Sequence, residues 1–274
     1  MAYDESKIEN SEIQYLYDSI FQKITNKMNK YAFDKNPSLY WANVMFQKFK
    51  IQFYSVMQLT YKRTRNPKNQ YQYLDIASIN SIIRSCFETF LIFEYIYTQS
   101  TSSDEKELKL LLYKYYGYKD ARKAVGKYKN PEECKEYNNY YNETKKEIEE
   151  MQLFNSLSKK ERQELLHINW KPSWNKIISK TKFSELMGKS EYGKLSWYVH
   201  NTFAALSTLN YHYTHLNEYD FDAINLQFYM IATFFVQSMM AQFDITKDLF
   251  SEDELGIMGE FLLLSTKEGH EDLR

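Results

Sequence analysis

The chain contains the stretch IIRSCFETFLIF at residues 82–93, in which apolar side chains almost surround two charged ones. Residues four apart share one face of an α-helix, so Arg84 and Glu88 are expected to lie one above the other. Charged side chains in such an apolar helix must be paired or must line a cavity, because burying a lone charge is too costly. The stretch therefore predicts a core helix that carries either a polar site or a buried ion pair.

A second stretch, KLSWYVHNTF at residues 194–203, repeats this pattern more than a hundred residues later. Ser196 and His200 share a helix face, and Trp197 and Asn201 flank that face. We expect the two stretches to converge in a helical core. The predicted catalytic residues are Arg84, Glu88 and His200, and the predicted pocket-lining residues are Ser196, Trp197 and Asn201.

The rest of the sequence is typical of an all-α protein. It has only 7 glycines and 4 prolines in 274 residues, although the two together make up roughly 12% of average proteins. Apolar residues recur at three- and four-residue spacing, for example at Ile13, Leu16, Ile20 and Ile24, and this period indicates amphipathic helices. We predict one domain over residues 1–274, folded as a bundle of about eight to ten helices. More than about 60% of the residues should be helical, with no sheet of three or more strands.

Charge and aromatic content bear on the partners of the chain. The balance of 35 basic against 36 acidic residues gives no global field that attracts a polyanion, so any contact with nucleic acid has to be local. The 25 tyrosines and 18 phenylalanines have two explanations, the codon bias of an AT-rich genome or an aromatic platform for nucleic-acid bases.

The cysteines, the first residues of the chain and its apolar segments predict a cytoplasmic protein. Cys86 and Cys134 have no metal or redox spacing, and the polar, acidic start of the chain differs from a signal peptide. The segment nearest to a membrane span is 223–243, but it contains Asn225 and Gln227 among other polar residues. We therefore predict a buried helix there and no membrane insertion.

The chemistry of the polar residues suggests two uses. An imidazole can take a proton from a ribose hydroxyl, and a guanidinium can stabilise the charge that develops on phosphorus. His200 and Arg84 would thus equip a ribonuclease that needs no metal or other cofactor. The alternatives are structural: Arg84 with Glu88 as a buried ion pair that fixes the helix register, and His200 as a hydrogen-bonded core histidine.

A metal site is weaker on this sequence. His212 and His215 stand three residues apart, with Glu218 following. The pair Glu164 and His167 has the spacing of a di-iron half-site, but such a site needs two of these motifs. We therefore predict no metal, and keep a di-metal oxidase only as a third hypothesis.

The two polar stretches resemble a large bacterial family of helical proteins of unknown function. That family has an Arg-Ser-x-x-Glu helix followed about a hundred residues on by Trp, Tyr and Leu-Ser-x-x-Val-His. Here the order is Arg84-Ser85-x-x-Glu88, Trp174, Tyr192 and then LSWYVH, which ends at His200. The resemblance covers about residues 76–206. It implies a HEPN-like architecture, a role in bacterial conflict or phage defence, and a pocket shared by Arg84, Glu88, Ser196 and His200.

The chain departs from HEPN ribonucleases in one respect, because their Arg and His lie close together on one helix. Arg162 and His167 fit the loose Arg-x(4–6)-His spacing of those enzymes, but such a match arises easily by chance. They are weaker site candidates, as are His212 and His215.

Two functions follow as expectations. The first is a HEPN-like effector that binds or cleaves RNA, without metal, in a bacterial defence or toxin system. The second is a non-catalytic helical module that binds a protein partner or a phosphorylated small ligand through the same pocket. The expected partners are RNA or a protein of the same defence system, together with a second copy in a homodimer.

Overall fold

A computed structural model describes residues 10–29, 36–61, 64–65, 72–73, 75–128, 131–183, 185–200, 202–214 and 218–265. Helices make up 86% of these residues, which confirms the all-α prediction for the described part of the chain. It contains twelve α-helices rather than eight to ten. The only sheet in it is a hairpin of two short antiparallel strands, β1 (Thr64–Arg65) and β2 (Gln72–Tyr73).

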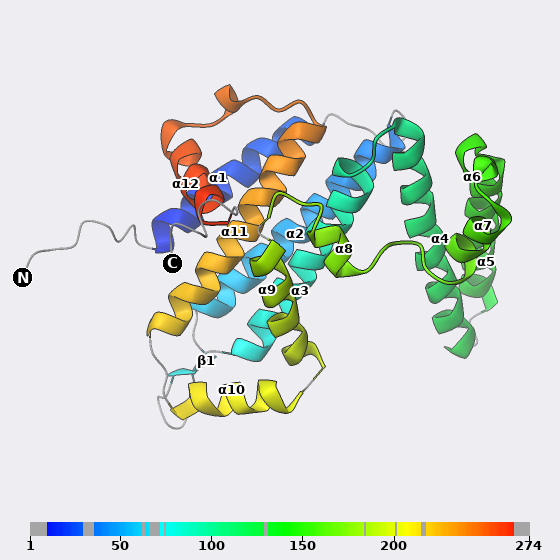
Figure 1. The fold of residues 1–274 in the computed structure, drawn as a ribbon. Helices are drawn as coiled ribbons and strands as arrows, with labels where there is room; N and C mark the ends of the chain where they lie inside the picture. Colours follow the sequence, from blue (N-terminus) through cyan, green and yellow to red (C-terminus); the bar gives the residue numbers. More distant parts are fainter. Residues whose placement is uncertain are drawn as a thin grey trace, which may run out of the picture. The chain divides into compact units, whose positions relative to one another are not determined.

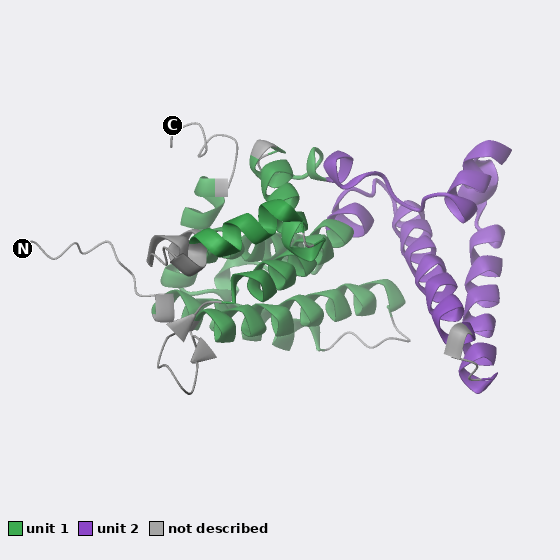
Figure 2. Ribbon diagram, turned by 90° about the horizontal axis from the view of Figure 1, so that it is seen from below, with its two compact units in different colours: residues 1–93, 178–274 green, residues 94–177 purple. Residues whose placement is uncertain are grey.

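The chain divides into two compact units (Figure 2). The first consists of residues 1–93 and 178–274, and the second of the continuous segment 94–177. That the whole chain is one domain stays a prediction. The second unit is inserted in the sequence between the two polar stretches, so the first unit is built from both halves of the chain.

The first unit is a bundle around an apolar central helix (Figure 1). Its elements are α1 (Asn10–Met28), α2 (Pro37–Tyr61), α3 (Ile76–Phe93), α9 (Glu185–Val199), α10 (Phe203–Thr214), α11 (Glu218–Gln242), the 3-10 turn Lys247–Leu249 and α12 (Glu252–Ser265). Helix α3 packs against α2 and α9 and also contacts α10 and α11. The helix expected over residues 223–243 is α11, which begins five residues earlier, at Glu218.

Aromatic rings fill the core of the first unit. Phe53 stacks on Phe228 with ring centroids 5.0 Å apart, and Phe49 meets Phe235 edge-on at 4.8 Å. Such pairs stabilise beyond the area they bury, by about 0.5–1.5 kcal/mol each. The fully buried Tyr17 donates its hydroxyl to the backbone oxygen of Tyr229, which satisfies its polar atom. The core thus supplies a rigid support for α3.

The second unit is built on a helical hairpin. Its elements are the π-helix Glu94–Thr98, α4 (Ser103–Tyr128), α5 (Pro131–Glu150), α6 (Gln152–Ser156), α7 (Lys159–His167) and α8 (Trp174–Ile178), whose last residue belongs to the first unit. Tyr115 stacks on Tyr141 at 4.8 Å and their hydroxyls lie 2.8 Å apart. The guanidinium of Arg122 lies 4.0 Å from the centre of the Tyr141 ring. Tyrosines therefore hold α4 to α5.

Among the described residues, the helix that is long and apolar enough to cross a membrane is Ile76–Thr98, not the segment 223–243 predicted above. By length and composition it could cross a membrane, but 56% of its most apolar window is buried inside the protein. It is the central helix α3 with its π-helical extension. This burial is typical of the core helix of a soluble protein.

Candidate functional site

Helices α3 and α9 position the polar site in the first unit. Arg84 and Glu88 are one turn apart on α3, and Tyr192 and Ser196 are one turn apart on α9. His200 follows the last residue of α9, and its backbone N–H donates to the oxygen of Ser196 at 3.2 Å, which continues the helical turn. Because α9 packs along α3, side chains from these two rows meet.

Arg84 is the centre of the hydrogen-bond network. Its Nε and Nη2 atoms donate to Glu88 Oε1 at 3.2 and 3.1 Å, and Nη2 also donates to the Tyr192 hydroxyl at 3.2 Å. The remaining nitrogen, Nη1, lies 3.4 Å from Nε2 of His200. Arg84 and His200, which are 116 residues apart in the sequence, are thus in direct contact in the fold.

Charge pairing keeps the guanidinium ionised. Burial disfavours the charge of Arg84, but the Tyr192 hydroxyl and the Glu88 carboxylate outweigh burial and raise its pKa. The Arg84 side chain is 13% exposed and that of Glu88 31% exposed. The pair is therefore partly open to solvent rather than sealed in the core, which differs from the fully buried ion pair considered above.

Tyr192 is the site residue that sequence reasoning left out of the site. Its hydroxyl donates to Glu88 Oε1 at 3.0 Å while it accepts from Arg84. Burial, and the nearby Glu88 carboxylate, raise the pKa of this hydroxyl, against the opposing effect of Arg84. It stays protonated near neutral pH and so acts as a donor. The spacing 192, 196, 200 on one helix face could have revealed it.

His200 lies at the solvent-exposed edge of the network. When Nε2 accepts a hydrogen bond from Arg84 Nη1, the lone pair of that nitrogen is occupied. Once free of that bond, the nitrogen of an exposed imidazole beside a guanidinium can take a proton from an incoming hydroxyl. The arrangement differs from that of a core histidine, because His200 is exposed.

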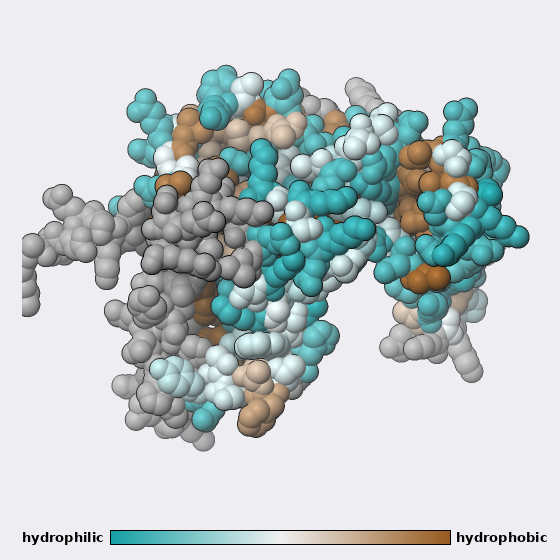
Figure 3. Space-filling view, viewed as in Figure 1, coloured by the Kyte–Doolittle hydropathy of each residue, from teal (hydrophilic) through white to brown (hydrophobic). Residues whose placement is uncertain are grey.

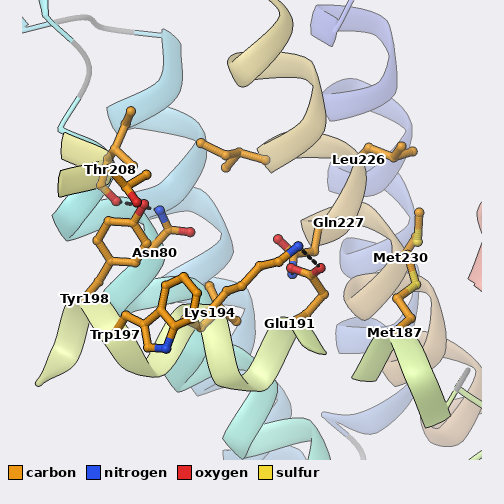
Figure 4. Close-up of a pocket in the computed structure, with 13 residues that line it drawn as sticks. Asn80, Met187, Glu191, Lys194, Trp197, Tyr198, Thr208, Leu226, Gln227 and Met230 are labelled. Atoms are coloured by element: carbon orange, nitrogen blue, oxygen red, sulfur yellow. Dashed lines mark hydrogen bonds and ion pairs between the residues drawn. The ribbon is translucent and has the colours of Figure 1, made fainter. Parts of the chain in front are cut away.

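Ser196 and Trp197 point to different surroundings. The hydroxyl of Ser196 donates to the backbone oxygen of Tyr192 at 2.6 Å. Trp197 lines a pocket of about 350 Å³ between α9, α3, α10 and α11 (Figure 4). The pocket lining includes Asn80, one turn before Arg84 on α3, but not Arg84, Glu88, Ser196 or His200. The predicted shared pocket is therefore two adjacent features, a polar network and a cavity.

The pocket has polar residues that the sequence analysis missed. Glu191 receives hydrogen bonds from Lys194, at 2.8 Å, and from the side-chain amide of Gln227 on α11 (Figure 4). The bond from Gln227 ties α11 to α9, whereas Lys194 lies one turn from Glu191 on α9 itself. No local pattern indicates the pairing of Glu191 with Gln227, because it joins segments 36 residues apart.

The weaker sequence candidates lie elsewhere. Arg162 and His167 belong to α7 in the second unit, and five residues on a helix place them about 140° apart, on different faces. Asn201 and His215 fall outside the described residues, as does the side chain of His212 on α10. Within the described residues, no group of three His, Cys, Asp or Glu side chains is placed to bind a metal ion.

Residues 68–219 match the DUF5677 family, a family of unknown function. The chain belongs to this family. The DUF5677 region includes α3 and α9, and hence every residue of the polar network, as well as the whole second unit. No curated protein and no solved structure matches the chain.

Proposed function

We propose that this DUF5677 protein is a HEPN-like effector that binds RNA and cleaves it at the Arg84–His200 pair, without a metal ion. We further propose that it acts in the cytoplasm of a bacterium, in a defence or toxin system. The observation that carries the proposal is the 3.4 Å contact between Arg84 and an exposed His200. The helical architecture and the resemblance described above support the HEPN-like assignment.

The proposed reaction is an internal transesterification of RNA. On substrate binding the His200 ring turns away from Arg84, which frees Nε2 to take the proton of a ribose 2′-hydroxyl, and the 2′-oxygen forms a bond to the adjacent phosphorus. The bond from phosphorus to the 5′-oxygen of the next nucleotide breaks, and the proton is returned to that oxygen. Arg84 stabilises the negative charge that develops on the phosphoryl oxygens. The products are a 2′,3′-cyclic phosphate and a 5′-hydroxyl.

Glu88 and Tyr192 position Arg84 in this scheme. Their oxygens hold Nε and Nη2, so that Nη1 is directed towards His200. A guanidinium held in one orientation before substrate arrives needs little reorganisation during the reaction. The network is only partly buried and lies at the solvent-facing end of α9. Positioning of Arg84 explains this location better than an ion pair that only fixes the helix register.

The test is cleavage of RNA in the presence of EDTA. The wild-type chain should cut RNA with excess chelator, and His200→Ala should lose at least about a hundredfold of the rate, the usual contribution of a general base. His167→Ala, an exposed histidine in the second unit, is the matched control and should keep full activity. Full activity of His200→Ala, or loss of activity in His167→Ala, would show that the proposed pair is wrong.

A second candidate function is a non-catalytic module that binds a protein partner. It is favoured by apolar side chains exposed beside the site: Phe203 is 84% and Leu206 56% exposed on α10. The hydrophobic colour at the end of α10 in Figure 3 marks this surface. Exposed apolar side chains grouped in this way are typical of interaction surfaces. An RNA-inactive wild type would make this the leading function.

A further inference from the structure

The pocket beside Arg84 has an unusual polar atom in its wall. Asn80 is only 7% exposed, and its side-chain nitrogen donates to the backbone oxygen of Ile76 at 2.9 Å. This bond fixes the orientation of the amide, so Oδ1 is its free end. Within the described residues, Oδ1 is not one of the buried side-chain atoms that lack a hydrogen-bond partner. An amide oxygen in the wall of a pocket can accept a hydrogen bond from a ligand there.

Aromatic rings stand at the same end of the pocket. Figure 4 shows Tyr198 and Thr208 beside Asn80, with the indole of Trp197 next to them. Trp197 is 43% exposed, so one face of its ring is open to a ligand. The far end is apolar, with Met187, Leu226 and Met230 (Figure 4). A flat ring that stacks on an aromatic residue and donates an N–H to Asn80 fits the first of these ends.

The distance to Arg84 adds a second requirement. Asn80 and Arg84 are four residues apart on α3, which corresponds to about 6 Å along the helix. A ligand seated against Asn80 can therefore place an anionic group near the guanidinium. A purely aliphatic ligand would cover Asn80 Oδ1 without supplying a donor, and its burial would leave that atom unsatisfied.

We infer that the 350 Å³ pocket is a nucleobase subsite, in which the base stacks on Trp197 and donates an N–H to Asn80, with its phosphate directed to Arg84. The inference rests on the proposed function, since it names the part of the RNA that seats next to the scissile phosphate. In this assignment Trp197 binds the base as part of the pocket wall, so it lies next to the polar network but does not belong to it.

Isothermal titration calorimetry with the four nucleoside 5′-monophosphates tests the subsite, with ribose 5-phosphate as the probe that lacks a base. At least one monophosphate should bind ten or more times tighter than ribose 5-phosphate. Trp197→Ala should weaken that binding at least about tenfold, as expected for loss of a stacking partner. Phe203→Ala, an exposed aromatic residue outside the pocket, is the matched control and should bind like the wild type.

Asn80→Leu tests the acceptor, and circular dichroism shows whether this variant is folded. Since Trp197 is largely exposed, Trp197→Ala keeps the test valid if Asn80→Leu does not fold. Equal binding of ribose 5-phosphate and the monophosphates, or unchanged binding by Trp197→Ala, would overturn the subsite.

His200→Ala separates the proposed subsite from the proposed RNA cleavage. Loss of cleavage with intact monophosphate binding supports both, whereas RNA cleavage at the wild-type rate by Trp197→Ala overturns the subsite alone. Tight monophosphate binding by a wild type that never cleaves RNA overturns cleavage alone.

Discussion

Arg84 is the side chain on which the site depends most, because it contacts Glu88, Tyr192 and His200. Arg84→Ala should lower the free energy of unfolding by about 1–2 kcal/mol, since a partly buried carboxylate loses its charged partner. This is less than the roughly 3–5 kcal/mol for a fully buried pair, because Glu88 is 31% exposed. Urea unfolding measures the change.

Two comparisons make this measurement specific. The double change Arg84→Met with Glu88→Leu should cost less than Arg84→Ala, because no charge is left unpaired. Lys146→Ala removes an exposed pair with Glu150 at the same spacing and should change stability by less than about 0.5 kcal/mol. A double variant as unstable as Arg84→Ala would contradict the ion-pair explanation.

Glu105 gives the second unit a pH-dependent contribution to stability. Partial burial opposes its charge, but bonds from Lys109 and from the backbone and hydroxyl of Thr101 outweigh it and lower its pKa to about 2. A lowered folded-state pKa stabilises above the unfolded value of 4.5 and loses this effect as pH falls towards 2. The stability difference between wild type and Glu105→Gln should therefore shrink between about pH 5 and pH 3 in urea titrations. A difference that is constant over this range would contradict the assignment.

Helix α9 carries half of the site, and its packing can be tested through its two glycines. A Cβ at Gly188 would lie 2.7 Å from a methyl group of the fully buried Ile178, so Gly188→Ala should destabilise by about 1–3 kcal/mol. A Cβ at Gly193 meets no atom within 4 Å, and Gly193→Ala in the same helix should stabilise by about 0.5–1 kcal/mol. Thermal unfolding followed by circular dichroism would distinguish them. Equal effects of the two substitutions would show that α9 packs differently.

Local patterns in the sequence predicted the helices well, but not all of their ends. Periodicity identified α3 and the contact of Arg84 with Glu88, and the Ser158-x-x-Glu161 capping box is formed at the start of α7. Helix α11 begins at Glu218 rather than at residue 223, and its first residues, Glu218–Asp222, are largely polar, so apolar content did not indicate this start. The π-helical turn after α3 has no local signal either, since it is set by packing.

The site was only partly predictable for a similar reason. The rows on α3 and α9 follow from four-residue spacing, so the contact of Arg84 with Glu88 was predictable, while the role of Arg84, Glu88 and His200 in catalysis stays a prediction. Tyr192 was not assigned to the site, because a tyrosine in an aromatic-rich chain does not stand out. The Glu191–Gln227 contact depends on how α9 lies on α11, which no local pattern encodes.

The connectivity of the whole chain explains the long sequence separation within the site. The second unit is inserted between α3 and α9, so the two helices of the site come from opposite sides of it in the sequence. The DUF5677 match spans both helices and the insertion. The matched region of this chain therefore contains the candidate site together with the inserted unit.

The most direct test of the central claim uses an RNA with a single 2′-deoxy substitution at a mapped cleavage position. The proposed chemistry takes its nucleophile from the 2′-hydroxyl, so the wild-type chain should fail to cut at that position in EDTA. The unmodified RNA should give fragments that end in a 2′,3′-cyclic phosphate. Cleavage at the substituted position, or fragments with 3′-hydroxyl ends, would contradict the transesterification at Arg84 and His200.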